Sequence, residues 1–244
     1  MNASIAREFA PSGVLRIGLN FGNPVVVQKD PSGGEPRGVG PDLGRELAKR
    51  LGLPVAYVAY ETAAALAQAA KREEWDLAFL ARDPERAGEI DFSAPYMLIE
   101  GTYMVAKDSD LRDVHDVDRE GIRIAVGDKT AYDLWLTRNI RQATLVKAAS
   151  SKAAIEQFRE QKLEAVAGVR QPLASVARTD PAYRVMDGSF MAIGQASGIP
   201  KGRDAAYRYL HAFIEEAKAG GFVARALAAS AQSATVAPAE DSPR

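Results

Sequence analysis

The chain has 244 residues, of which 47% are hydrophobic and 26% are charged, with a net charge of −1 and no cysteine. This composition allows a sizeable core but leaves no global basic field for nucleic acid or an anionic membrane surface. Without cysteine, and with His115 and His211 as the only histidines, the chain excludes disulfides and thiol catalysis, and we expect no metal site and no cofactor.

The first part of the chain alternates short apolar runs with helix-forming stretches. Residues 14–20, 54–60 and 75–81 are expected to be strands, and residues 41–52 and 63–74 helices. Between the first strand and the first helix, residues 25–38 predict a strand and a Gly/Pro-rich hairpin turn. Such alternation is typical of a mostly parallel sheet covered on both faces.

The same alternation begins again further on. Strands are expected at 121–127, 143–148 and 163–168, with helices at 130–140 and 151–162 between them. A last helical stretch covers 204–230 and is expected to break near Gly220 and Gly221.

Two extended crossings separate these two sets of elements. The predicted fold class is therefore α/β, with two three-layer lobes: residues 13–100 plus 195–230 form lobe 1, and 106–189 form lobe 2. The hinge crossings are 101–105 and 190–194. Residues 1–12 and 231–244 are expected to be loose termini.

Neither end of the chain predicts a membrane anchor. The first residues contain no apolar run long enough for a signal peptide, and no window of about 18 apolar residues is expected to span a membrane.

Several motifs occur in a recognisable order and spacing. They are "PRGVGPDLGRELAKRLG", "WDLAF…PERAGEIDFSAPY", "GIRIAVGDKT", "LEAVAG" and "GIPKG". Together they resemble the family 3 bacterial solute-binding proteins, over roughly residues 13 to 230. The resemblance implies the type II periplasmic-binding-protein fold and a receptor that delivers amino acids or similar solutes to an ABC transporter.

The resemblance assigns a role to Arg86, in "DPERAGEIDFSAPY". Family members use this arginine to grip the ligand's α-carboxylate through both guanidinium nitrogens, a geometry that lysine does not reproduce. The alternative is a surface arginine satisfied by Asp83 or Glu89.

Other first-lobe positions match the family pattern only partly. Asn20 and Asn23 stand where an acid and an aromatic wall are common, and Phe21 either supplies the wall or belongs to the core. Phe79 and Ala81 occupy the region where the family has a hydroxyl donor, and Arg82 either adds a cation or points to water.

In the second lobe the resemblance places Thr130, Ala131 and Tyr132 at a helix start that faces the ligand. Free N–H groups at a helix start bind anions, but Thr130 is equally explained as an N-cap. Lys129 stands where the family has glycine.

The largest departure from the family is at Val169. Amino-acid receptors commonly place an aspartate here, five residues after the position of Glu164, to pair with the ligand's α-ammonium. Val169 cannot do this, and Arg170 would repel an ammonium, so the residues favour a small organic anion over a standard α-amino acid. Glu61 or Asp128 remain alternatives for holding an amine.

The predicted function is therefore a solute-binding receptor for a small carboxylate-bearing ligand, with an ABC transporter permease as the partner and a monomeric state. No catalytic residue is assigned. The alternatives are an enzyme resembling cyclohexadienyl dehydratase on the same fold, or a stand-alone ligand-sensing domain. The family implies the periplasm, and the absence of a visible signal peptide leaves the cytoplasm as the alternative.

Overall fold

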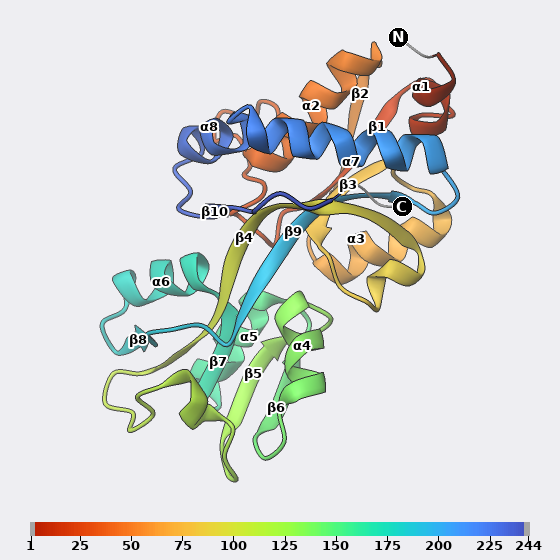
Figure 1. Cartoon of the computed structure of the whole chain (residues 1–244). Helices are drawn as coiled ribbons and strands as arrows, with labels where there is room; N and C mark the ends of the chain where they lie inside the picture. Colours follow the sequence, from red (N-terminus) through yellow and green to blue (C-terminus); the bar gives the residue numbers. More distant parts are fainter. Residues whose placement is uncertain (1–2, 242–244) are drawn as a thin grey trace. The chain divides into compact units, whose positions relative to one another are not determined.

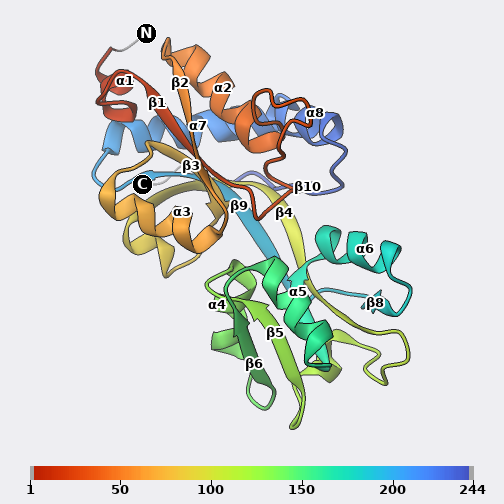
Figure 2. The same cartoon turned by 180° about the vertical axis from the view of Figure 1, so that it is seen from behind.

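The computed structural model describes residues 3–241, which divide into two compact units (Figures 1 and 2). Unit 1 consists of residues up to 98 together with those from 194 onward, and unit 2 of residues 99–193. The chain passes from one unit to the other within two strands, β4 (Ile90–Ala106) and β9 (Met191–Pro200).

Unit 1 is built on a mixed sheet whose strands follow the order β2-β1-β3-β9-β4. Its first three strands are parallel, β9 runs antiparallel to β3, and the short β10 runs antiparallel to β4. The strands that complete the sheet are β1 (Leu15–Asn20), β2 (Val55–Tyr60), β3 (Leu77–Ala81) and β10 (Thr235–Val236). The helices are α1 (Ala3–Phe9), α2 (Val39–Leu51), α3 (Ala63–Ala69), α7 (Asp204–Ala219) and α8 (Phe222–Ala229), with 3-10 turns η1 (Ala70–Arg72) and η2 (Arg86–Gly88).

The alternation of side chains along β1 and β3 explains why helices cover both faces of this sheet. Ile17 points toward Gly44 of α2, whereas a Cβ at the next residue, Gly18, would meet Leu66 of α3 at 2.6 Å. Leu66 and Trp75 form part of a fully buried cluster on the α3 face. Glycines at 18 and 44 therefore let the helices lie close against the strands.

Asp76 is a buried hub in unit 1. Its carboxylate accepts hydrogen bonds from Arg16 of β1 and from Arg203, which precedes α7, and Arg203 also donates to the Phe9 carbonyl of α1. A buried carboxylate is stable only when it is paired and hydrogen-bonded. These contacts satisfy Asp76 and join the start of the chain (α1 and β1) to the residue before β3 and the residue before α7.

Both termini are more ordered than the sequence indicates. Residues 3–9 form a helix whose Glu8 carboxylate accepts hydrogen bonds from the N–H groups of Ala205 and Ala206 at the start of α7. Near the other end, β10 pairs with β4. The parts of the expected loose termini at residues 1–2 and 242–244 lie outside the described residues.

Unit 2 holds the remaining strands of the same sheet, which continues through β4: β7 lies between β4 and β5, β6 pairs with β5, and β8 pairs with β4. Its strands are β5 (Arg123–Gly127), β6 (Thr144–Ala148), β7 (Ala165–Val169) and β8 (Tyr183–Val185), and its helices are η3 (Val114–Val117), α4 (Ala131–Asn139), α5 (Ser151–Glu160) and α6 (Arg170–Thr179).

Helices cover both faces of this sheet as well. Met104 of β4 packs with Phe158 of α5 and Leu173 of α6. The next residue back, Tyr103, lies on the other side, where its ring is 4.6 Å from that of Phe190, which in turn lies 5.4 Å from Trp135 of α4. The expected α/β architecture is thus present in each unit.

The segment predicted as a hairpin at 25–38 is different. Val25, Val26 and Val27 are buried and form a turn instead of a strand. The N–H groups of Val26 and Val27 both donate to the Asn23 carbonyl. Of the expected hairpin, only an antiparallel bridge between Gln28 and Arg37 is present. The helix predicted to begin at Pro41 begins at Val39, after Gly38 with φ 113°.

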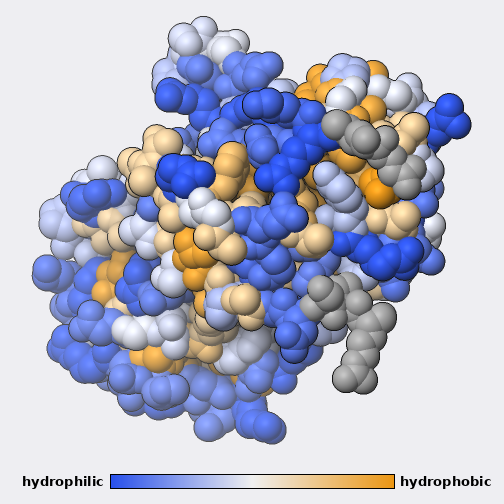
Figure 3. Space-filling model, turned by 45° about the horizontal axis from the view of Figure 1, so that its top comes forward, coloured by the Kyte–Doolittle hydropathy of each residue, from blue (hydrophilic) through white to orange (hydrophobic). Residues whose placement is uncertain are grey.

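None of the helices between residues 3 and 241 is long and apolar enough to cross a membrane. On the face drawn in Figure 3, hydrophobic side chains are scattered among hydrophilic ones.

Candidate functional site

The loop after β1 uses its two asparagines to shape the backbone. Asn20 Oδ1 accepts a hydrogen bond from Gly22 N at 2.9 Å, and Asn23 Oδ1 accepts one from Val25 N at 3.3 Å. A side chain at Gly22 would meet the Glu61 carbonyl at 2.6 Å, so this turn requires glycine. Asn20 and Asn23, both assigned to the ligand site from the sequence, thus stabilise backbone turns with their side-chain oxygens.

Phe21 is half-buried and carries a cation that sequence reasoning did not consider. Lys29 Nζ lies 5.3 Å from the centre of the Phe21 ring and 3.7 Å from a Glu61 carboxylate oxygen. The aromatic ring expected as a ligand wall therefore already has a lysine over its face.

Arg86, the central residue of the prediction, lies at the start of η2 with a side chain only 6% exposed. Its Nη1 donates to the Ala81 carbonyl at the end of β3, at 2.9 Å. Two backbone hydrogen bonds stabilise the turns around Arg86: Ala87 N donates to the Asp83 carbonyl, and Glu89 N donates to the Arg86 carbonyl. We name residues 81–89 the Arg86 loop.

The charge of Arg86 is costly to bury. Burial lowers the pKa of its guanidinium to about 10, against the opposing effect of the negative charges of Asp83 and Glu85. Asp83 is itself 5% exposed, and its Oδ1 accepts a hydrogen bond from Glu85 N. The guanidinium is thus a desolvated cation, in an environment where a hydrogen-bonded anion gains more than it would in water.

Other residues assigned to this part of the site have structural contacts. Phe79, at 2% exposure, packs against Gly40 and Gly44 of α2, edge-on to Tyr96, and so lies in the core of unit 1. Ala81 contributes its carbonyl to Arg86. Arg82, for which the sequence left open a second cation of the site or a side chain pointing to water, forms a half-exposed ion pair with Glu240 at 2.9 Å.

In unit 2, Thr130 is the N-cap of α4. Its hydroxyl accepts a hydrogen bond from Asp133 N and donates to the Gly127 carbonyl. The preceding Lys129 has φ 53°, a left-handed conformation that favours glycine, which explains why the family pattern has glycine at this position. Asp133 holds this strained turn by accepting from Lys129 N at 2.7 Å.

The rest of this helix start is well packed. Ala131 is buried, and the buried Tyr132 shares a hydrogen bond with the Ser151 hydroxyl at 2.7 Å. Asp133 is fully buried and also accepts from Lys147 Nζ at 3.1 Å. Thr130, Ala131 and Tyr132 are therefore consecutive residues at the start of α4, and the side chain of Tyr132 is buried.

Val169 and Arg170 mark the junction of β7 and α6. Val169 pairs with Gly101 of β4 and stands at the N-cap position, where its apolar side chain offers no hydrogen bond. Arg170 donates to the Glu100 carboxylate and to the carbonyls of Met186 and Gly188. Its three guanidinium nitrogens are thus engaged within unit 2.

Sequence reasoning missed the partners of these residues. Glu100 stands 70 positions before Arg170, and Glu240 stands 158 positions after Arg82. Such pairs carry no local pattern. Asp133, by contrast, lies three residues after Thr130, and this spacing is typical of a helix-start hydrogen bond.

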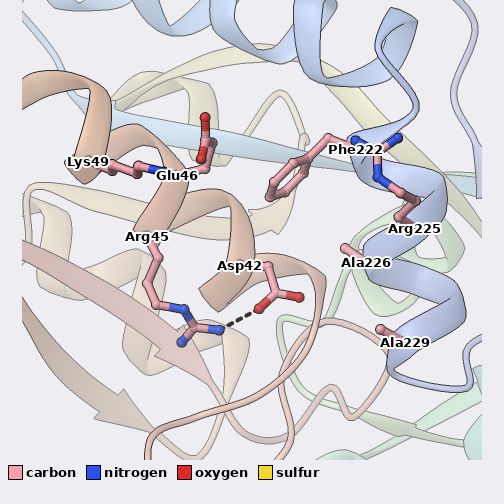
Figure 4. A pocket seen from close by; sticks show the side chains of 8 residues that line it. All are labelled: Asp42, Arg45, Glu46, Lys49, Phe222, Arg225, Ala226 and Ala229. Atoms are coloured by element: carbon pink, nitrogen blue, oxygen red, sulfur yellow. Dashed lines mark hydrogen bonds and ion pairs between the residues drawn. The ribbon is translucent and has the colours of Figure 1, made fainter.

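A separate groove of about 380 Å³ lies in unit 1 between α2 and α8 (Figure 4). Asp42, Arg45, Glu46 and Lys49 line it from α2, and Phe222, Arg225, Ala226 and Ala229 from α8. The close-up shows the Asp42–Arg45 ion pair within it. No residue of the predicted ligand site lines this groove.

Residues 15–229 match the sequence profile of the bacterial extracellular solute-binding proteins, family 3. A search of curated protein sequences finds no match.

Solved structures share the fold at low sequence identity. The solute receptor for L-cysteine of Neisseria gonorrhoeae superposes with a TM-score of 0.78 and 23% identity, covering 93% of this chain and 92% of that one. An amino acid ABC transporter substrate-binding protein from Streptococcus pneumoniae, bound to L-arginine, gives 0.78 and 19%, covering 97% and 100%. The ancestral amino acid-binding protein AncCDT-1, a precursor of cyclohexadienyl dehydratase, gives 0.75 and 23%, covering 92% and 98%. These likenesses confirm the predicted fold class, that of type II periplasmic binding proteins.

Proposed function

Because the chain belongs to the bacterial extracellular solute-binding proteins of family 3, we propose that it captures a small carboxylate-bearing solute for an ABC importer. The observation that carries the proposal is Arg86, a desolvated guanidinium within the "PER…DFSAPY" motif. A planar guanidinium binds a carboxylate through two parallel hydrogen bonds, which are strong where water is excluded.

The start of α4 is the second element of the proposal. Its first turn offers backbone N–H groups and the positive end of the helix dipole, both suited to an anionic group. Thr130 serves this turn as the cap, so its hydroxyl fixes the geometry of the amides.

We propose an amine-free acid as the preferred solute. Val169 supports this choice, because an α-ammonium placed beside it would lose water without gaining a counter-ion. Arg170 supports it less than its charge suggests, since its guanidinium is engaged by Glu100 and two carbonyls. The argument therefore depends on the missing aspartate.

For the receptor mechanism we propose closure, in which the bound state is favoured because the solute binds it better. The segments 101–105 and 190–194 are the proposed hinges. These two segments lie beside each other, since a Cβ at Gly101 would meet Met191 at 2.8 Å and Phe190 at 3.1 Å, and the chain changes unit just before residue 101 and within 190–194. Small-angle scattering with and without solute tests it, and an unchanged radius of gyration on saturation contradicts closure.

The experiment is a thermal-shift comparison of matched acids: L-alanine with pyruvate and L-lactate, L-glutamate with 2-oxoglutarate, and L-phenylalanine with phenylpyruvate. A solute at about 100 times its dissociation constant stabilises by about 2.7 kcal/mol, which moves the midpoint by roughly 5–10 °C. Shifts confined to the amine-free acids support the proposal, and shifts with the amino acids overturn the preference.

Val169→Asp is the complementary variant. It restores the carboxylate that the family uses for the α-ammonium, so the variant is expected to gain a shift with at least one amino acid of the panel. Val169→Asn is the matched control, similar in size but uncharged. An equal gain in both variants contradicts the electrostatic reasoning.

A further inference from the structure

After α8 the chain does not leave unit 1 but returns along β4. Thr235 and Val236 pair with Leu98 and Met97, and Ala237 N then donates to the Tyr96 carbonyl at 3.1 Å. In Figure 1 this segment, in dark blue, runs beside β4. We name residues 235–240 the strap.

Lys218 of α7 fixes the strap from the helix side. Its Nζ donates to the Pro238 carbonyl at 2.8 Å and to the Pro95 carbonyl at 3.2 Å, and lies 2.6 Å from a Glu215 carboxylate oxygen. The Lys218 side chain is only 5% exposed. One buried ammonium therefore joins the strap, β4 and α7, a use of lysine that requires every donor to be satisfied.

The strap then reaches the Arg86 loop. Glu240 Oε2 accepts from Arg82 Nη1 at 2.9 Å, and Arg82 N donates to the Gly194 carbonyl at 3.0 Å. Arg82 follows Ala81 directly, and the Ala81 carbonyl accepts the hydrogen bond from Arg86. The peptide that holds Arg86 is thus fixed on one side by β9 and on the other by the strap.

The exposed Arg82–Glu240 ion pair and the buried contacts of the strap differ in strength and therefore in role. The Arg82–Glu240 pair is 46% and 40% exposed, so it contributes little to global stability. The ladder with β4 and the buried Lys218 are what hold the strap in place. The exposed pair has a local effect: it restricts Arg82, next to the carbonyl that positions Arg86.

We propose that Glu240 is a positioning residue of the candidate solute site, and that the strap holds the Arg86 loop in the conformation that presents its guanidinium. The role of Glu240 in solute binding rests on the function proposed above, whereas the restraint that the strap places on the Arg86 loop is measurable without any solute. The C-terminal segment is then part of the binding apparatus of the receptor.

Amide hydrogen exchange of the full chain in D₂O, without solute, tests the restraint. Glu240→Gln keeps the shape and removes the charge, so the amides of Arg82 and Ala87 are expected to exchange roughly two- to five-fold faster, the range for an exposed ion pair. The matched control is Glu216→Gln, which removes the exposed ion pair to Arg50 in the same unit. The control is expected to leave the Arg86 loop unchanged.

Two further variants separate positioning from general loosening. The charge reversal Arg82→Glu with Glu240→Arg is expected to restore slow exchange. Ala237→Pro, which removes the N–H that donates to Tyr96, is expected to accelerate exchange in the Arg86 loop at least as much as Glu240→Gln. Unchanged exchange in both Glu240→Gln and Ala237→Pro overturns the proposal, as does equal acceleration in the Glu216→Gln control.

The binding arm uses each acid of the thermal-shift panel that stabilises the wild type. Glu240→Gln is expected to weaken its affinity by at most the factor measured in exchange, because the apparent dissociation constant rises only as the binding-competent fraction of the loop falls. An unchanged affinity despite faster exchange overturns the role in binding. If no acid of the panel binds the wild type, the proposed function fails instead, and the exchange result still decides whether the strap restrains the loop.

Discussion

Replacing Arg86 by lysine separates the charge of this residue from its planar geometry. Lysine keeps a positive group on a long stem but cannot form the two parallel hydrogen bonds that a carboxylate accepts from arginine. The variant also differs in a second way, because lysine releases its proton more easily than arginine in the same buried place.

The magnitude follows from the burial of this position. The lowering of the Arg86 pKa to about 10 is the net result of burial, which disfavours the charged form, and of Asp83 and Glu85, which favour it; this net effect is on the order of 3 kcal/mol against the charged form. The same buried environment lowers the pKa of a lysine at this position well below its ordinary value of about 10.4, so that the lysine loses its proton within the pH range of a stability experiment. Wild-type Arg86 stays protonated up to about pH 9 in both folded and unfolded chains.

The sign of each effect is therefore fixed. In Arg86→Lys the folded chain loses its proton at lower pH than the unfolded chain. Unfolding free energy is then expected to rise, by about 1–2 kcal/mol between pH 7 and pH 10. Affinity for an acid of the panel is expected to fall over the same range as the ammonium is lost. The wild type shows neither trend below pH 9.

Urea unfolding at several pH values measures the first effect, and titration calorimetry the second. If the stability of Arg86→Lys does not change with pH, the position is not desolvated. If the variant binds the acid as tightly as the wild type at every pH, the carboxylate is not held by this side chain. Arg82→Lys, at a more exposed cation of the same loop, is the matched control.

Three further predictions concern stability. Asp76→Asn is expected to lower the unfolding free energy by about 3–5 kcal/mol in urea, since it leaves Arg203 buried beside a neutral amide, whereas Glu216→Gln is expected to change it by less than about 0.5 kcal/mol. Thr130→Ala is expected to cost about 1 kcal/mol through loss of the cap, and Thr130→Ser to cost much less, as measured by the thermal midpoint. The hydrogen bond from Arg123 is the chief cause that lowers the pKa of Glu164 below its ordinary value of 4.5. Glu164 therefore contributes to the unfolding free energy at neutral pH, and this contribution is lost as the pH falls below about 4.5. Glu164→Gln is expected to reduce this loss of stability in acid, as measured by urea unfolding at several pH values.

Local patterns predicted most of the helices and strands correctly. The helix at 41–52 has leucines at helical spacing and a glycine stop, and the structure has α2 from Val39 to Leu51 with Gly52 in the left-handed conformation. An N-cap was one of the two interpretations of Thr130, which stands before a helix-forming run, and its hydroxyl caps α4 by a side-chain hydrogen bond. These features depend on residues a few positions apart.

Features that depend on distant partners were not predictable in this way. The helix α1 is short, and isolated helices of this length are marginal in water. Its Glu8 accepts hydrogen bonds from two N–H groups at the start of α7, almost 200 residues further along the chain. The two-residue strand β10 has too little sequence to show any periodicity. The contacts of Arg82 and Arg170 likewise depend on which acids the fold brings beside them.

The site prediction shows the same limit. The motif around Arg86 predicts its chemical role from the family, and the sequence also offers Asp83 as a neighbour. Nothing in the sequence indicates that Arg86 Nη1 donates to Ala81, or that Arg86 and Asp83 are both buried. Phe79 has the composition of a pocket wall and also that of a core residue. Only the close approach of α2 at Gly40 and Gly44 places it in the core.

The division of the chain into a continuous unit 2 and a discontinuous unit 1 has a consequence for synthesis on the ribosome. Unit 2 is complete once residue 193 has emerged, whereas the sheet of unit 1 lacks the neighbour of β3 until β9 has been made. The first 98 residues must therefore wait with an unpaired β3 edge while about a hundred more are translated, for several seconds at ordinary elongation rates. A nascent chain stalled before β9 is accordingly the species in which chaperone binding to this protein is expected to be strongest.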